Sequence, residues 1–182
     1  MQTIPTALPG CVLVRQPVVR DDRGWFWKLA HADTFASLGL RSDFRESYCT
    51  ASEPGVLRGM HFQTPPHDHA KLVACLSGQV IDVVLDLRKD SPTFGRFASF
   101  ELVPDTGEAI YIPSGVAHGF VALEPSLLLY NVTSTHTPSH DHGVLWSSFG
   151  FTWPVGNPRL SARDLAHPRF DDFVSPFEFG RS

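Results

Sequence analysis

Proline and glycine recur at such short intervals along this chain that little room is left for long helices. The 182 residues include 15 Pro and 14 Gly. The apolar runs between them are only about 4–9 residues long, which is typical of strands rather than of helices. The sequence therefore predicts a series of short strands, at 10–15, 25–29, 44–50, 56–62, 71–76, 79–87, 96–102, 109–112, 119–122 and 127–132.

The segment 80–88 shows the strand pattern most clearly. Its aliphatic residues alternate with a row that contains Asp82 and Asp86, so both carboxylates face the same side of the strand. An unpaired charge in a protein interior is costly. If Asp82 faces the interior, we therefore expect it to have a partner.

Helix signals are confined to two places. One helix is predicted at 33–38, with Asp33 or Thr34 as its cap and Gly39 closing it in a left-handed conformation. Near the end of the chain, Ser161 can cap a short helical turn. Many strands with so little helix predict an all-β sandwich or barrel.

Composition and length are those of one domain, residues 1–182, with a sizeable core, since 42% of the residues are apolar. The net charge of −4 gives no broad attraction to nucleic acid or to an anionic membrane. No apolar run reaches the 18 or so residues that span a bilayer, and no secretory signal is visible at the start. Cys11, Cys49 and Cys75 form no CxxC pair. These features predict a cytoplasmic protein with free thiols.

The stretch 107–118 carries the most informative motif. Gly107, Pro113, Gly115 and His118 match the second cupin motif, G-x5-P-x-G-x2-H-x3-N, whereas Ala122 replaces the final Asn. The spacing predicts a strand, a tight Pro-Ser-Gly turn and a second strand that presents His118 to a barrel interior.

The first cupin motif, which supplies most ligands in metal-binding cupins, is incomplete. His67 and His69 form an HxH pair, but no Glu follows within four residues, so the carboxylate of the usual metal-binding set is missing. The neighbouring prolines place the pair in a solvated loop. We therefore expect no metal. A metal-dependent dioxygenase or sugar-phosphate isomerase stays an alternative if His67, His69 and His118 converge.

Further segments narrow the resemblance to one family. They are Asp22-Arg-Gly, Val56-Leu-Arg-Gly-Met-His-Phe-Gln, Lys71-Leu-Val, the run from Asp86 to Gly95, Ala117-His-Gly-Phe, Tyr130, Trp146 and Leu160-Ser-Ala-Arg-Asp. Over nearly the whole chain this pattern resembles the dTDP-4-dehydrorhamnose 3,5-epimerase family. The resemblance implies a jelly-roll β-barrel that uses no cofactor. It also implies a homodimer in which strands within about residues 1–30 are exchanged, and epimerisation at C3 and/or C5 of a nucleotide-linked 4-keto-6-deoxyhexose.

The reaction requires a base, an acid and a group that holds an enolate. The C4 ketone acidifies the hydrogens on C3 and C5, and histidine, which titrates near neutral pH, suits the base. The resemblance implies that His61 is this base and that Asp164 orients it. It implies Tyr130 as the acid across the sugar ring, and Lys71 near the C4 oxygen, where negative charge develops.

The resemblance also implies a set of substrate-binding residues. Arg23 and Arg58 match residues that contact the diphosphate, which suits the guanidinium fork. His118 and Asp82 match a second His–Asp pair inside the barrel. The set is completed by Gln63, Lys28, Glu46, Tyr48, His136 and Asp141.

The chain departs from the family pattern at the nucleotide end. Lys28 stands where relatives usually carry Glu, Glu46 and Tyr48 stand in place of a Gln-x-Asn pattern, and His136 lies where an aromatic residue is common. A lysine cannot accept the N3 hydrogen of thymine, whereas it can donate to a base that presents an acceptor, such as cytosine. One hypothesis is therefore a nucleotide other than dTDP, such as CDP. Epimerisation at C3 only or at C5 only stays open.

One point of geometry is left to the structure. Arg58 and His61 are three residues apart, so they share a pocket only if the strand ends or bulges between them, which Gly59 permits.

A cupin that binds a nucleotide sugar without turnover is the alternative function. A 3,4-ketoisomerase is disfavoured because that class lacks the RGxHFQ context.

Overall fold

The computed structural model describes residues 1–180, and most of this part of the chain forms antiparallel strands. The strands are β1 (Gln2–Pro5), β2 (Val12–Arg15), β3 (Val18–Asp21), β4 (Gly24–Trp27), β5 (Glu46–Ser52), β6 (Leu57–Gln63), β7 (Lys71–Ser77), β8 (Val80–Asp86), β9 (Phe97–Leu102), β10 (Glu108–Ile112), β11 (Val116–Ala122), β12 (Ser126–Val132) and β13 (Asp141–Gly143). The helices are short: α1 (Ala32–Ser37), α2 (Ala162–Leu165) and three 3₁₀ turns at Pro104–Thr106, Pro138–His140 and Phe170–Asp172.

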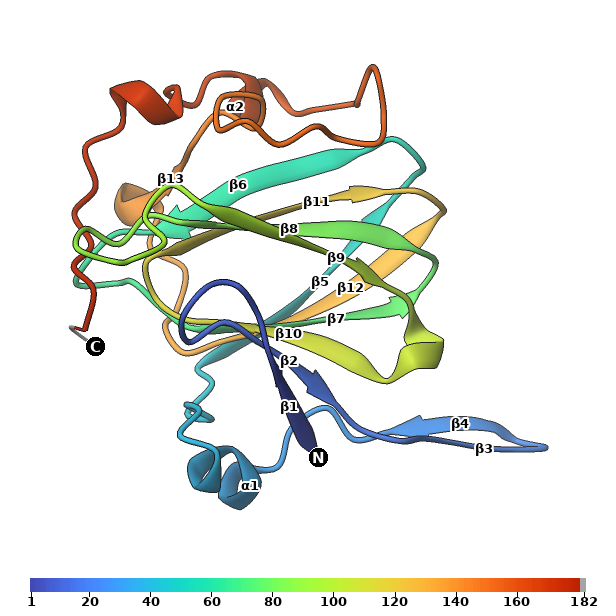
Figure 1. Ribbon diagram of the computed structural model, residues 1–182. Helices are drawn as coiled ribbons and strands as arrows, with labels where there is room; N and C mark the ends of the chain where they lie inside the picture. The colour runs from blue at the N-terminus through green and yellow to red at the C-terminus, as the bar shows by residue number, and fades with distance from the viewer. Residues whose placement is uncertain (181–182) are drawn as a thin grey trace.

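Two sheets face each other and enclose the interior of a jelly-roll β-barrel (Figure 1). One sheet has the order β1-β2-β10-β7-β12-β5, and the other has the order β13-β6-β11-β8-β9. Because side chains alternate along a strand, each sheet sends one row of residues inward and one outward. Along β8, Val80, Asp82 and Val84 belong to the inward row, while Val83 and Leu85 pack in the outer layer.

Apolar side chains form three layers. The first lies between the sheets and includes Val73, Val80, Ile110, Phe120 and Leu128. The second lies outside the β13-β6-β11-β8-β9 sheet, under the C-terminal segment. The third lies outside the other sheet, against the segment around α1. Since the first layer fills only part of the barrel, the rest of the interior is left for polar residues on the same inward rows.

All ten predicted strands are confirmed, with ends that differ by at most three residues. Three strands escaped prediction: β1, β3 and β13. The helix near 33–38 is also present, and Gly39 adopts a φ of +70°, as expected for a left-handed closing residue. The predicted cap is wrong, because His31 holds the N-cap position and makes no side-chain cap hydrogen bond. Ser161 does cap α2, by accepting from the Asp164 N–H at 3.1 Å.

A hairpin of β3 and β4 stands apart from both sheets and projects away from the barrel (Figure 1). It forms its own two-stranded sheet and leaves large apolar side chains uncovered, with Val19 59%, Trp25 47% and Phe26 62% exposed. Among the described residues, no helix is long and apolar enough to cross a membrane.

Candidate active site

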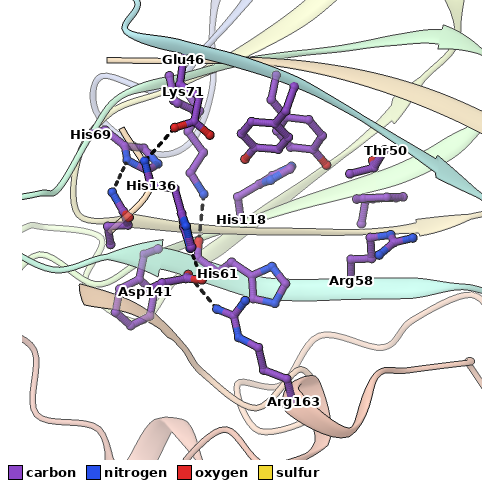
Figure 2. A pocket seen from close by; sticks show the side chains of 16 residues that line it. Glu46, Thr50, Arg58, His61, His69, Lys71, His118, His136, Asp141 and Arg163 are labelled. Atoms are coloured by element: carbon purple, nitrogen blue, oxygen red, sulfur yellow. Dashed lines mark hydrogen bonds and ion pairs between the residues drawn. The ribbon is translucent and has the colours of Figure 1, made fainter. Parts of the chain in front are cut away.

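A cavity of about 330 Å³ opens into the barrel between the two sheets (Figure 2). Ten of the residues singled out from the sequence line it together: Glu46, Tyr48, Arg58, His61, Gln63, Lys71, His118, Tyr130, His136 and Asp141. These residues come from β5, β6, β7, β11, β12, β13 and the segment that leads into β13. The cavity therefore draws on both sheets.

A bulge in β6 brings Arg58 and His61 to the same cavity. His61 pairs with His118 of β11, and Arg58 pairs with Phe120, so two residues of β6 lie opposite the single residue Gly119. Gly59, inside this bulge, has a φ of +146°, and a Cβ added there would lie only 2.6 Å from the Gly119 Cα. Of the two ways in which Arg58 and His61 could share a pocket, a strand end or a bulge, the structure shows the bulge. A residue larger than glycine does not fit in it.

His61 and Asp164 form a short hydrogen bond at the wall of the cavity. The distance from His61 Nε2 to Asp164 Oδ1 is 2.5 Å. The His61 side chain is 29% exposed, whereas the Asp164 side chain is 5% exposed. Burial alone raises a carboxyl pKa, but the hydrogen bond and charge of His61 outweigh it and lower the pKa of Asp164. Asp164 is therefore an ionised partner that can hold the imidazole in one orientation.

Tyr130 lies deep in the cavity between another aromatic ring and a second His–Asp pair. Its ring stacks on Tyr48 with centroids 4.7 Å apart, and it meets the His118 ring edge-on at 5.8 Å. His118 Nε2 lies 2.6 Å from Asp82 Oδ2, so the partner expected for Asp82 is present. Burial raises the pKa of Tyr130 well above its ordinary value, so the phenol keeps its proton at neutral pH.

Lys71 is the buried cation of the cavity. The residue is only 6% exposed, and its Nζ donates a hydrogen bond of 3.1 Å to the His61 carbonyl oxygen. Burial lowers the pKa of Lys71 from 10.5 to about 8, against the opposing attraction of the Asp141 and Asp82 carboxylates. At neutral pH it is still an ammonium, poised to interact strongly with an anion that enters the cavity.

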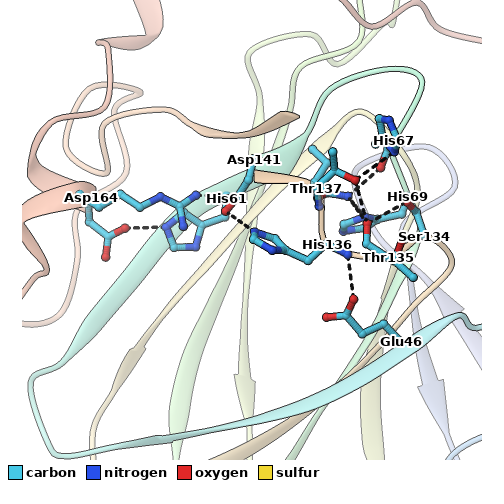
Figure 3. A network of polar contacts seen from close by, with 12 residues as sticks. Glu46, His61, His67, His69, Ser134, Thr135, His136, Thr137, Asp141 and Asp164 are labelled. Atoms are coloured by element: carbon cyan, nitrogen blue, oxygen red, sulfur yellow. Dashed lines mark hydrogen bonds and ion pairs between the residues drawn. The ribbon is translucent and has the colours of Figure 1, made fainter. Parts of the chain in front are cut away.

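A chain of polar contacts crosses the cavity beside His61 (Figure 3). Glu46 accepts the His136 backbone N–H at 2.7 Å, and His136 Nε2 lies 3.1 Å from Asp141 Oδ2. Asp141 also forms an ion pair with Arg163, in which Arg163 Nη2 lies 2.7 Å from Asp141 Oδ1. Burial raises the pKa of Asp141, but Arg163 and His136 outweigh it and lower that pKa overall. Asp141 thus holds the side chains of Arg163 and His136 together at the wall of the cavity.

The HxH pair lies in the loop between β6 and β7, but His69 is not the solvated side chain that was expected. It lines the cavity, its Nδ1 lies 3.1 Å from Gln63 Nε2, and burial lowers its pKa to about 3. Gln63 also donates to the His67 carbonyl oxygen at 2.8 Å. In the described chain, His67, His69 and His118 do not gather into a metal-ligating group.

Four predicted residues do not line the cavity. Asp164 and Asp82 lie behind His61 and His118 and contact them through their carboxylates. Arg23 lies in the turn of the β3–β4 hairpin, and Lys28 directly follows β4. Both residues are exposed, and neither reaches the cavity of its own chain.

The sequence argument missed three residues at or near the site: Arg163, His69 and His167. Arg163 was quoted within the Leu160–Asp164 motif but was given no role, although its position before Asp164 was a usable signal. His69 was considered only as a metal ligand. His167 packs against His61 with ring centroids 5.6 Å apart, and no motif marks it.

The barrel and its cavity define a class of enzyme. A His–Asp pair, a protonated phenol and a buried ammonium surround one small space, which equips it to move protons on a carbon next to a carbonyl. The protein is thus an isomerase built on a cupin-type jelly roll.

Comparison with known proteins identifies the family. A family model described as dTDP-4-dehydrorhamnose 3,5-epimerase matches residues 5–172, and the chain belongs to this family. The dTDP-4-dehydrorhamnose 3,5-epimerase of Salmonella typhimurium is 39% identical over 176 residues, which cover 94% of this chain and 96% of that protein. A dTDP-4-dehydrorhamnose 3-epimerase of Streptomyces niveus is 36% identical over 90% of this chain and 81% of its own length.

A solved structure agrees in fold over almost the full length. The epimerase of Legionella pneumophila, crystallised in complex with dTDP-4-keto-L-rhamnose, superposes with a TM-score of 0.90 at 29% identity, covering 95% of this chain and 94% of that one. The resemblance noted from the sequence segments is therefore confirmed, as are the fold and the class of reaction.

Proposed function

We propose that this chain epimerises a dTDP-linked 4-keto-6-deoxyhexose, with His61 as the base and Tyr130 as the acid. The observation that carries the proposal is the 2.5 Å contact between His61 and Asp164 at the wall of a cavity that Tyr130 also lines. An imidazole held by an ionised carboxylate can take up a proton, and a phenol that keeps its proton at neutral pH has one to give. The two groups come from β6 and β12, on opposite sheets.

The proposed reaction has two proton transfers. His61 takes the proton from the carbon next to the C4 ketone, and the electron pair moves into the ketone to form an enolate. Lys71 stabilises the enolate oxygen with its buried ammonium, where a positive charge is far more effective than in water. Tyr130 then donates a proton to the opposite face of the same carbon, which inverts its configuration. Solvent restores the starting state by taking the proton from His61 and returning one to Tyr130.

The cationic side chains at the cavity are suited to bind the anionic diphosphate of the substrate. Arg58 and Arg163 both line the cavity. Each guanidinium has more N–H donors than its protein partners take, so both can still bind oxygen anions. The relative from Legionella pneumophila is named as a complex with dTDP-4-keto-L-rhamnose, which supports dTDP as the nucleotide. Competition binding of dTDP, UDP, CDP and GDP tests this choice. A preference for CDP would instead favour the cytosine hypothesis drawn from Lys28.

A homodimer is proposed in which the N-terminal strands, within about residues 1–30, are exchanged. Three observations support it: the hairpin projects from the barrel, it exposes Val19, Trp25 and Phe26, and its Arg23 does not reach the cavity of its own chain. An exposed apolar hairpin of this kind needs a cover. Sedimentation velocity of the wild type and of a Phe26→Asp variant tests the proposal, which predicts a dimer and a shift toward monomer. A monomeric wild type contradicts it.

One domain and a cytoplasmic location are part of the same proposal. Cys11, Cys49 and Cys75 are all free, which is the usual state in a reducing compartment. Fractionation of cells that express the tagged protein tests the location.

The decisive experiment is incorporation of solvent deuterium into the dTDP-4-keto-6-deoxyhexose, followed by NMR. We expect exchange in the wild type and a loss of at least about 1,000-fold in His61→Ala, since the base contributes roughly that much to proton transfer. The control is His142→Ala, which removes an exposed histidine of β13. Exchange at C3, at C5 or at both shows which carbons are handled. Tight binding without exchange in the wild type would favour the non-catalytic cupin.

A further inference from the structure

A third side chain stands beside the His61–Asp164 pair and has no part in the proposed reaction. His167 follows α2, and its ring packs edge-on against the His61 ring at 5.6 Å and an interplanar angle of 73°. The ring also occupies the space next to Gly143, the β13 residue that pairs with His61. A Cβ added to Gly143 would lie 2.4 Å from His167 Nε2. The position of this imidazole is therefore built into the fold.

The His167 Nε2 atom is buried and has no hydrogen-bond partner among the described residues. Its nearest charged neighbour is Asp164 Oδ1 at 3.8 Å, too far for a hydrogen bond. The side chain is only 10% exposed, so water has little access to it. A buried polar atom without a partner calls for an explanation, and a bound ion is one of the few available. Burial also lowers the pKa of His167, which favours the neutral imidazole that metals bind.

The three side chains together present a donor set for a metal ion. His61, Asp164 and His167 each offer one ligand atom, and these atoms all lie within 4.8 Å of one another. Two imidazole nitrogens and one carboxylate form a common three-ligand set for Zn²⁺, with the fourth position left to water or substrate. Zn–ligand bonds of about 2.0–2.1 Å separate tetrahedral ligands by roughly 3.3 Å. The His61–Asp164 contact of 2.5 Å therefore has to widen by roughly 0.8 Å, while His167 Nε2, 3.8 Å from Asp164 Oδ1, has to draw closer. The partly exposed His61 side chain is the one with room to move.

We propose that His61, Asp164 and His167 bind a zinc-like divalent cation, and that the bound ion switches the enzyme off reversibly. The ion replaces the proton that His61 Nε2 donates to Asp164, and the neutral ring then keeps its one proton on Nδ1, so His61 cannot accept the substrate proton while the ion is bound. Two nitrogen ligands and a single carboxylate select Zn²⁺, Co²⁺ or Ni²⁺ over Mg²⁺ and Ca²⁺, which prefer oxygen. The inhibitory part of the inference rests on the function proposed above, whereas the binding part does not.

The binding part is tested with Co²⁺, whose visible absorption reports its coordination. Full-length protein freed of metal by chelator is titrated with Co²⁺, and Zn²⁺ is then added to displace it. We expect one Co²⁺ per chain with a tetrahedral or five-coordinate spectrum, and binding at least tenfold weaker in His167→Phe, which keeps a ring against Gly143. The matched control His67→Phe removes a histidine of the HxH pair and should bind Co²⁺ like the wild type.

Two results overturn the binding proposal: no Co²⁺ spectrum at millimolar metal, or equal binding in His167→Phe and the wild type. Wild-type crystals soaked in Zn²⁺ give a test that needs no variant, by anomalous scattering at the zinc edge. A peak bounded by His61, Asp164 and His167 supports the site, and a peak only elsewhere overturns it.

The inhibitory part is tested by deuterium exchange at fixed pH with increasing Zn²⁺. We expect loss of exchange at the concentration that displaces Co²⁺, recovery with chelator, and at least tenfold more Zn²⁺ for half inhibition in His167→Phe, relative to its own uninhibited rate. Exchange that is unaffected by saturating Zn²⁺ overturns the switch. If metal binds but metal-free protein shows no exchange with any substrate, the proposed function fails while the metal site stands.

Discussion

The buried ammonium of Lys71 should make the wild-type protein less stable at neutral pH than a variant without it. A pKa that falls from 10.5 to about 8 corresponds to roughly 3 kcal/mol of destabilisation of the charged form, at about 1.4 kcal/mol for each tenfold change. Lys71→Met removes this cost and keeps a chain of similar length in the cavity. It also removes the hydrogen bond to the His61 carbonyl oxygen, worth about 1–2 kcal/mol.

The balance predicts that Lys71→Met raises the free energy of unfolding by about 1–2 kcal/mol at pH 7. For a chain of this size that amounts to a rise in Tm of roughly 2–8 °C. The sign depends on pH in a defined way. The folded pKa lies below the unfolded pKa, so the wild type loses stability as the pH falls from 10.5 to about 8. The advantage of the Met variant should therefore be complete below about pH 8 and be gone near pH 9, since the wild type regains about 1.4 kcal/mol per pH unit. At pH 10.5 only the lost hydrogen bond is left, and the wild type should be the more stable protein.

Urea unfolding followed by tryptophan fluorescence, at pH 7 and pH 10 and at matched protein concentration, measures both quantities. Lys89→Met is the control, because Lys89 is an exposed lysine and its replacement should give a small difference at both pH values. Deuterium exchange should fall at least about 100-fold in Lys71→Met if the ammonium holds the enolate. A Met variant that is less stable than the wild type at pH 7, or equally more stable at both pH values, would refute the argument from burial.

Three further substitutions test how the site is held. Gly59→Ala should lower the free energy of unfolding by roughly 2–4 kcal/mol and abolish exchange, because the bulge cannot take a Cβ; wild-type behaviour contradicts this. Asp86→Asn should cost about 3–5 kcal/mol, since it leaves the buried Arg88 guanidinium unpaired; a loss below 1 kcal/mol contradicts the buried pair. Asp82→Asn should cost about 1–3 kcal/mol while exchange persists, because His118 is a supporting residue; complete loss of exchange contradicts that role. Urea unfolding and deuterium exchange check all three.

The strands that could be predicted are those whose inward and outward rows are both apolar or clearly alternating. Segment 80–88 is an example, because both of its faces pack against apolar layers. The strands that escaped carry no such pattern. β13 has the sequence Asp-His-Gly and is a strand only because it pairs with β6. β1 contains two polar residues and a proline, and its pairing with β2 determines it.

The site was predictable where a contiguous motif carried it, as in the β6 segment around His61. It was not predictable where the position depends on a distant backbone. His167 lies over Gly143 and beside His61, and neither contact can be derived from spacing along the chain. The same holds for His69, since its burial depends on how the loop after β6 turns back toward the cavity.

The two His–Asp pairs of the barrel are similar in geometry but differ in burial, which suits them to different roles. Their distances are nearly equal, 2.5 Å for His61–Asp164 and 2.6 Å for His118–Asp82. Their exposures differ, because the His61 side chain is 29% exposed and the His118 side chain is 4% exposed. A base must meet its substrate and return its proton, so the more exposed pair suits catalysis and the deeper pair suits support of Tyr130.

The exposed pair also depends on a different part of the chain. His118 and Asp82 lie on neighbouring strands of one sheet, whereas His61 meets an aspartate 103 residues further on, in α2. α2 belongs to the C-terminal segment, whose apolar side chains cover the outside of the same sheet, and Ser161 fixes its first turn. The proposed catalytic pair is therefore complete only when that segment has docked. Loosening the outer apolar layer should impair proton transfer before the barrel itself unfolds, because the barrel strands do not need Asp164 but His61 does.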